Sequence, residues 1–147
     1  MSFNSNWPRW IAGSIYKHFI TNKGSYTLFV EGQERKTNLL SDFLELQWDG
    51  PDIDLYPSDE YNAEIEICVR VFTTIGRDIY LIDKMVGQAM VGFTKTIPVY
   101  EIEDSPGTQI GCLQLISGTL RTHRYGVERP DNKILQSTVE ARYKIDL

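Results

Sequence analysis

The sequence is poor in the residues that build disulfide scaffolds and metal centres, since its 147 residues include only two cysteines and two histidines. Cys68 and Cys112 stand in separate predicted strands, and neither His18 nor His123 follows them at a metal-ligand spacing. We therefore expect two reduced cysteines that pack within a sheet, and we expect no metal and no cofactor.

The sequence also lacks a long apolar run. No segment approaches the roughly 20 apolar residues that span a membrane, and the N-terminus has no apolar signal-peptide core. The net charge of −5 argues against the basic surface with which DNA-binding proteins hold phosphates. We expect a soluble protein, made in a cytoplasm, with no membrane and no specific DNA as a partner.

Catalytic motifs are missing as well. The sequence contains no G-x-S-x-G, H-E-x-x-H, Walker loop or C-x-x-C motif. His123 is the only plausible base, and it lies between Arg121 and Arg124 on a predicted strand with no orienting acid at a recognisable place. This favours a protein that is not an enzyme; a small enzyme that uses His123 with a carboxylate is the alternative.

Residues 50–60, with the sequence GPDIDLYPSDE, combine four carboxylates with two prolines. We expect an acidic surface loop here, which ends a strand predicted for Phe43–Trp48 at the turn residues 49–52. A calcium site is the alternative, although the spacing is not that of an EF-hand loop.

The most regular stretch of the sequence runs from Tyr61 to Phe93. Its first part alternates apolar and polar residues, which is the period of a half-buried strand. The apolar set is Ala63, Ile65, Ile67, Val69 and Val71. After a break at residues 73–76, Ile79–Phe93 has the period of an amphipathic helix, with Asp78 as its expected cap. The apolar arc of this helix is Ile79, Ile82, Met85, Val86, Ala89, Met90 and Phe93.

A second amphipathic helix is predicted near the N-terminus. Asn6 is its expected N-cap, Pro8 then falls in the first turn, and Lys23 with Gly24 ends the helix. Its expected apolar face is Trp7, Ile11, Ala12, Ile15, Tyr16 and Phe19. Trp10 falls on the polar side, so it is either covered by another part of the same chain or exposed as an anchor for a partner.

Five shorter strands are expected at residues 25–31, 43–48, 97–102, 109–117 and 120–128. The last strand, Ile134–Leu147, repeats the strict alternation of Tyr61–Thr74, and two strands with matched one-sided patterns normally pair. A long strand followed by a helix that packs on its apolar face is the nucleus of an α+β fold. We therefore predict a single α+β domain over residues 1–147, with a mainly antiparallel sheet and two amphipathic helices packed on one face.

The polar sides of the two long strands form the most informative surface. The residues that we expect at an interface, besides Trp10, are Glu64, Glu66, Arg70, Glu140, Arg142 and Lys144. Opposite charges on neighbouring strands can pair across an antiparallel sheet. A long face of mixed charge suits contacts with neighbours in an assembly, and plain exposure to solvent is the alternative.

The order of these elements resembles that of the tail terminator proteins of long-tailed, lambda-type bacteriophages. The resemblance is carried by the strand Ala63–Phe72, the helix Ile79–Phe93 and the hairpin Tyr125–Leu147. A small hairpin that ends near Phe29-Val30-Glu31-Gly32 adds to it. The resemblance covers most of the chain and depends on element order and pattern.

A tail terminator is a structural virion protein of the tail and neck, made in the cytoplasm of the host bacterium. The resemblance implies a hexameric ring that caps the last ring of tail tube protein, stops its polymerisation and offers a joint to the head connector. DNA would cross the central channel without specific binding. Another neck or head-completion protein of a phage is the alternative.

Overall fold

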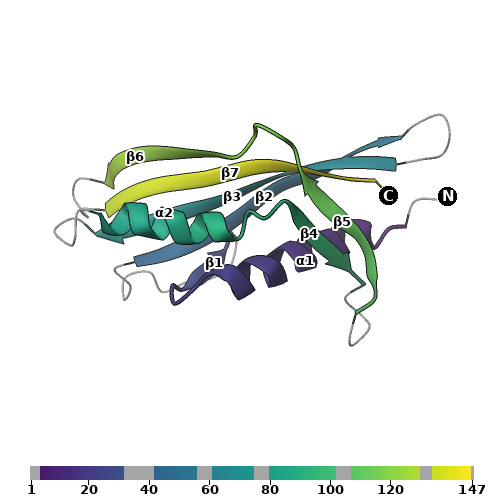
Figure 1. Cartoon of the computed structure of the whole chain (residues 1–147), viewed down its shortest axis with the longest axis horizontal. Coiled ribbons are helices and arrows are strands. Elements are labelled where there is room, and N and C mark those ends of the chain that lie inside the picture. Colours follow the sequence, from purple (N-terminus) through teal and green to yellow (C-terminus); the bar gives the residue numbers. More distant parts are fainter. Residues whose placement is uncertain are drawn as a thin grey trace.

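The computed structural model describes residues 4–31, 42–55, 61–74, 80–101, 107–129 and 134–146, and the seven strands within them form one sheet. Figure 1 shows an elongated sheet with both helices on the same side of it. The elements, in chain order, are α1 (Trp7–Asn22), β1 (Leu28–Val30), β2 (Asp42–Leu55), β3 (Tyr61–Thr74), α2 (Leu81–Val91), β4 (Thr96–Tyr100), β5 (Gln109–Leu115), β6 (Arg121–Arg129) and β7 (Ile134–Asp146).

The centre of the sheet is the antiparallel pair of β3 and β7. Their register runs from Asn62 opposite Asp146 to Thr74 opposite Ile134, so the two long alternating strands pair as the sequence predicts. The alternate residues of both strands lie in one hydrophobic core. These buried residues are Ala63, Ile65, Ile67, Val69, Val71, Val139, Ala141, Tyr143 and Ile145.

Strand β2 is longer than the sequence predicts. It pairs with β3 from Asp42 to Leu55, through an irregularity between Asp49 and Asp52. Gly50 has a φ of 111°, and a Cβ there would stand 3.0 Å from the backbone oxygen of Glu64. The Gly-Pro pair at this position therefore forms a bulge within the strand instead of ending it. The expectation of a loop is wrong for residues 50–55, and residues 56–60 lie outside the described part.

The first strand corrects another expectation. Instead of a hairpin, β1 forms a parallel pair with β2, with Leu28 opposite Leu44 and Val30 opposite Leu46. The sheet is therefore mixed, although its other pairs are antiparallel. A parallel neighbour needs a crossover instead of a tight turn. Alternation within so short a segment does not specify the direction of pairing.

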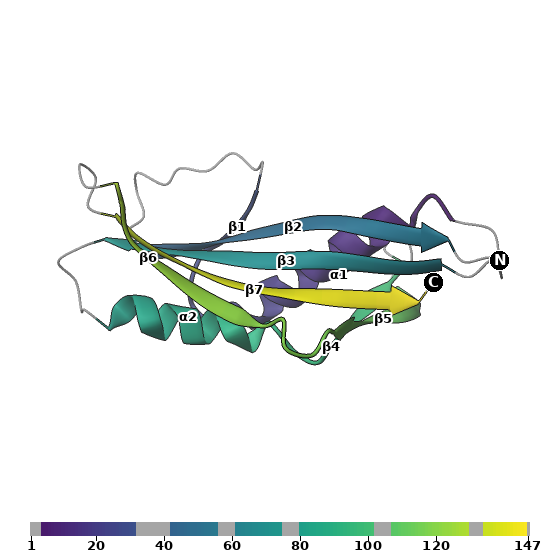
Figure 2. The same ribbon diagram turned by 90° about the horizontal axis from the view of Figure 1, so that it is seen from above.

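The far side of β7 is shared by two strands, as Figure 2 shows from above. Strand β6 pairs with the first half of β7, and β5 pairs with it at Lys144 and Tyr143. Strand β4 completes the sheet beyond β5 and carries Pro98, which is tolerated because β4 is an edge strand.

Both helices pack on the apolar face of the sheet, as predicted, and no helix of the described part is long and apolar enough to cross a membrane. The rings of Phe19 on α1 and Phe93 after α2 meet edge to face, with centroids 5.0 Å apart. Tyr143 donates a hydrogen bond of 2.7 Å to the backbone oxygen of Thr94. Burial raises the pKa of this tyrosine, because the phenolate would lose its hydration.

The buried side of α1 is rotated from the expected one. Trp10 and Ser14 are buried beside Ile11, whereas Tyr16 is exposed and Ala12 is only partly buried. Ser14 lies inward because its hydroxyl accepts a hydrogen bond of 3.0 Å from the backbone N–H of Tyr100 on β4. A hydropathy pattern treats serine as a surface residue, so it does not anticipate this contact.

Helix α2 is shorter than expected, because it begins at Leu81 with Tyr80 as N-cap. The expected cap, Asp78, and the expected first residue, Ile79, lie outside the described part. Ile82, Met85 and Ala89 are buried as predicted. Met90 is 39% exposed, which corrects its place in the apolar arc.

Candidate functional site

The side of the sheet away from the helices, called the open face below, is the candidate site. It carries the side chains that alternate with the core residues on the three longest strands. They include Glu45, Gln47, Asp49 and Asp52 on β2, Glu64, Glu66, Cys68 and Arg70 on β3, and Thr138, Glu140, Arg142 and Lys144 on β7.

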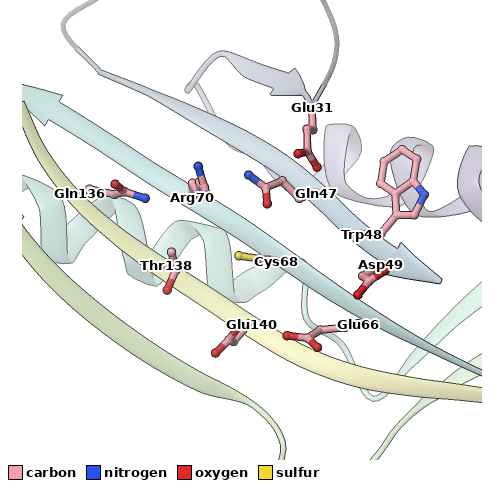
Figure 3. Close-up of a pocket in the computed structure, with 10 residues that line it drawn as sticks. All are labelled: Glu31, Gln47, Trp48, Asp49, Glu66, Cys68, Arg70, Gln136, Thr138 and Glu140. Atoms are coloured by element: carbon pink, nitrogen blue, oxygen red, sulfur yellow. The ribbon is translucent and has the colours of Figure 1, made fainter. Parts of the chain in front are cut away.

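The middle of the open face is hollowed. The hollow has a volume of about 570 Å³. Figure 3 shows the ten side chains that line it, which come from the end of β1 and from β2, β3 and β7. They are Glu31, Gln47, Trp48, Asp49, Glu66, Cys68, Arg70, Gln136, Thr138 and Glu140. Four carboxylates and one guanidinium give this hollow an acidic lining.

A buried carboxylate stands beside the hollow. Glu45 is 6% exposed and accepts a hydrogen bond of 2.9 Å at Oε1 from Nε2 of Gln47. Nη1 of Arg70 lies 4.0 Å from the same oxygen. These partners offset the cost of removing the Glu45 charge from water. The charge of Arg70 is therefore directed toward Glu45 as well as toward the hollow.

Like charges face each other across the first two long strands. The register places Asp49 opposite Glu66 and Asp52 opposite Glu64. Like charges in directly opposite positions destabilise an antiparallel pair. Arg142 relieves part of this repulsion, since it stands opposite Glu66 and its Nη2 lies 3.6 Å from Oε2 of Glu64. The β2 side of the face keeps its excess of negative charge.

The six charged residues predicted for an interface do lie together on the open face. Lys144 stands opposite Glu64, and Glu140 pairs with Arg121 of β6. Cross-strand charge pairing is therefore confirmed for Glu64 with Arg142. A role for the six in contacts with a partner stays a prediction. The pattern missed Gln47 and Asp49, whose place in the hollow depends on the register between β2 and β3.

Trp10 is not exposed, so the structure corrects the expectation of an accessible anchor. Its side chain is only 6% exposed and belongs to the hydrophobic core. Its ring meets that of Trp7 edge to face, with centroids 6.1 Å apart. The other interpretation, a tryptophan covered by its own chain, is the one that fits.

The two histidines have different surroundings. His123 is exposed on β6, between Arg121 and Arg124. His18 is half-buried, and its Nε2 lies 2.9 Å from the backbone oxygen of Gly92, so it links α1 to the end of α2. Burial lowers the pKa of His18, an effect only partly opposed by this hydrogen bond. His18 thus connects structural elements, which the sequence analysis did not anticipate.

The cysteines are partly buried and form no disulfide. Cys68 lies on β3 at the floor of the hollow, and Cys112 lies on β5. Burial, together with nearby carboxylates such as Glu140, raises the pKa of Cys68 to about 11. The thiol therefore stays protonated at neutral pH, which makes it a poor nucleophile. Within the described ranges, no group of three or more His, Cys, Asp or Glu side chains is arranged to hold a metal ion.

No protein-family model and no curated protein matches this sequence. Among solved structures, the chain is similar to a chain of the virion of a native gene transfer agent particle. The two share 9% sequence identity with a TM-score of 0.56, and the match covers 98% of this chain and 100% of the other. At this identity the likeness shows a common fold, and that fold extends over practically the whole length of both chains.

Proposed function

We propose that this protein is a structural component of a phage-type virion. In this proposal it forms a ring at the head-proximal end of the tail, where it ends polymerisation of the tail tube and provides the joint to the head connector. DNA passes through the ring without being bound specifically. The protein has no catalytic role.

The observation that carries the proposal is the match in fold, end to end, with a chain of a gene transfer agent virion. The match spans 98% of this chain and 100% of the other, so the likeness concerns the whole fold and not a local motif. The element order that resembles tail terminators gives independent support for the position at the end of the tail.

The surface chemistry also supports assembly. On the open face, Asp49 stands opposite Glu66 and Asp52 stands opposite Glu64. These like charges lower the stability of a free monomer, so their presence suits a face that meets other subunits. An acidic face also suits a channel for DNA, because a basic lining would hold the passing phosphates. The hexamer predicted from the resemblance would weigh about 100 kDa, for six copies of the 16.9 kDa chain.

The experiment is removal of the gene from the particle's genome, followed by electron microscopy of the assembled structures. A tail terminator leaves tubes of irregular and excessive length when it is absent, together with heads that carry no tail. Expression of the intact chain in trans should restore tails of uniform length.

Two other outcomes identify other functions. Tails of normal length beside tailless heads would contradict termination and would favour a neck or head-completion protein. Complete and infectious particles would contradict any structural role in the virion. Labelling of the restored particles with an antibody to this chain tests its position directly, since the proposal expects label only between head and tail.

A further inference from the structure

Charge changes systematically from one side of the sheet to the other. Strand β2 contains five carboxylates and no basic residue, whereas β6 contains three arginines, one histidine and one glutamate. The strands between them are intermediate, since β3 has a net charge of −1 and β7 of zero. Because the strand order is β2, β3, β7, β6, the sheet has one acidic side and one basic side.

Both of these sides are open within the described part of the chain. Strand β6 pairs with β7 alone. Strand β2 pairs with β1 only over Leu44–Leu46, so its second half, Gln47–Leu55, has a described partner strand only on the β3 side. Figure 2 shows these two open stretches on opposite edges of the sheet.

Negative charge is concentrated at the acidic edge. Asp49 and Asp52 are exposed on the second half of β2, and each stands opposite a glutamate of β3. The basic edge presents the matching charges. Arg121 and Arg124 are exposed on β6, with side chains 71% and 57% accessible, and their pairs with Glu140 and Asp83 leave most of each guanidinium in solvent.

On the basis of the ring in the proposed function, we propose that neighbouring subunits join head to tail through the acidic β2 edge and the basic β6 edge. The second half of β2 of one copy lies along β6 of the next copy, so that Asp49 and Asp52 meet Arg121 on the open face, while Arg124 adds positive charge to the same edge from the helix side. The partner at each edge is a second copy of this chain. Such a heterologous contact repeats with the same sense, and it gives a ring when the rotation from one copy to the next closes.

The charges also select against the wrong arrangement. Two β2 edges facing each other would bring together only carboxylates, and two β6 edges would bring together mainly arginines. Like charges brought together at an interface cost several kcal/mol, so both symmetric pairings are disfavoured. Only the head-to-tail contact places acid against base.

The two edges are displaced along the strands. Strand β6 pairs with residues 134–140 of β7. Across β3, this part of β7 is level with residues 42–47 of β2, whereas the open stretch of β2 is its second half. A displacement of about six residues corresponds to roughly 20 Å at the usual rise per strand residue. In closed β-barrels, neighbouring strands are tilted and staggered by a constant amount, so a constant offset between subunits is compatible with closure.

Charge reversal tests the contact. One variant carries Asp49→Lys and Asp52→Lys, and the other carries Arg121→Glu and Arg124→Glu. Each variant alone has two edges of the same sign, so self-assembly measured by analytical ultracentrifugation should weaken by about 100-fold or more. A control with Lys17→Glu and Lys84→Glu changes the net charge by −4, as the arginine variant does, but on the two helices, and it should assemble as the wild type does.

Mixing the two variants gives the decisive result. The acidic β2 of the arginine variant fits the basic β6 of the aspartate variant, and the reversed edges fit each other. An equimolar mixture should therefore form rings in which the two variants alternate, a pattern that closes only with an even number of subunits. Native mass spectrometry of one isotope-labelled variant should show equal numbers of both.

The outcomes separate this inference from the proposed function. A wild-type protein that stays monomeric at high concentration overturns both. Wild-type rings that persist in both variants, or a mixture that fails to assemble although each variant is folded by circular dichroism, overturn the edge contact alone. If a double variant does not fold, the single variants Arg121→Glu and Asp52→Lys, at exposed positions, take its place in the same mixing experiment.

Discussion

Replacement of glycine by alanine should have opposite effects at two positions near the end of α2. Gly87 is an exposed residue in the middle of the helix, and a Cβ there would meet nothing within 4 Å. Gly92 is the buried C-cap, and a Cβ there would stand 2.6 Å from two carbon atoms of the Phe19 ring. The backbone of Gly92 is right-handed, with φ of −71°, so the obstacle is steric and not conformational.

The magnitudes follow from these surroundings. Alanine is preferred to glycine within a helix by about 0.5–1 kcal/mol, so Gly87→Ala should raise the free energy of unfolding by that amount. Gly92→Ala forces the buried Phe19 ring to move, although Phe93 packs against it at 5.0 Å. Overpacking of this kind lowers the free energy of unfolding by about 1–3 kcal/mol.

Urea denaturation monitored by circular dichroism measures both changes on the same scale. The variant Phe19→Leu in the Gly92→Ala background adds a double-mutant cycle, in which the smaller side chain should recover part of the loss. A Gly92→Ala protein as stable as the wild type would refute the close approach of α1 to the end of α2. Equal effects at Gly87 and Gly92 would refute the difference in surroundings.

Three further changes test the core and the hollow. Ile67→Asp should abolish cooperative unfolding, because it places an unpaired charge at a position with no exposure, and a sharp thermal transition would contradict the assignment. Trp10→Ala should lower the free energy of unfolding, measured in urea, by about 3–5 kcal/mol, as for a core tryptophan. A change within about 0.5 kcal/mol would instead favour the interpretation of Trp10 as an exposed anchor. In a Cys112→Ser background, alkylation of Cys68 at pH 8 should be slow and should accelerate toward pH 11. Its raised pKa leaves about 100-fold less thiolate than a free thiol has, and a rate equal to that of the urea-unfolded chain would contradict this.

The parts of the fold that the sequence predicts well are those in which one period persists over many residues. Strand β3 begins at Tyr61 as predicted and continues to Thr74, two residues into the expected break, and its five alternate apolar residues are all buried. Strand β7 repeats this pattern and pairs with β3 as expected. A one-residue slip would expose an entire apolar set, so long alternating strands specify their own register.

The features that were missed depend on contacts between distant segments. A turn and a bulge use the same residues, and Gly50-Pro51 becomes a bulge only because β3 continues beside it. Ser14 is buried because β4 donates a hydrogen bond to it, and the parallel direction of β1 depends on a crossover. None of these contacts leaves a period in the sequence.

The candidate site was predictable as a surface but not as an arrangement of charge. Alternation alone gives the side on which Glu66 and Arg142 lie. It does not give the neighbour of each strand, and the order β2, β3, β7, β6 is what separates acid from base. If the strands lay in the sheet in chain order, β6 would lie between β5 and β7. Its arginines would then be away from either edge of the sheet.

This order explains why an unfavourable arrangement persists on an otherwise well-packed sheet. Asp49 opposite Glu66 weakens the pairing of β2 with β3, and a lysine at Asp49 would remove the repulsion within the subunit. That change would also place a positive charge against the arginines of β6, so the attraction in the proposed head-to-tail contact would weaken. In the proposed head-to-tail contact, the arginines of a neighbouring subunit would offset this repulsion, so the stability that the free subunit loses would be recovered on assembly.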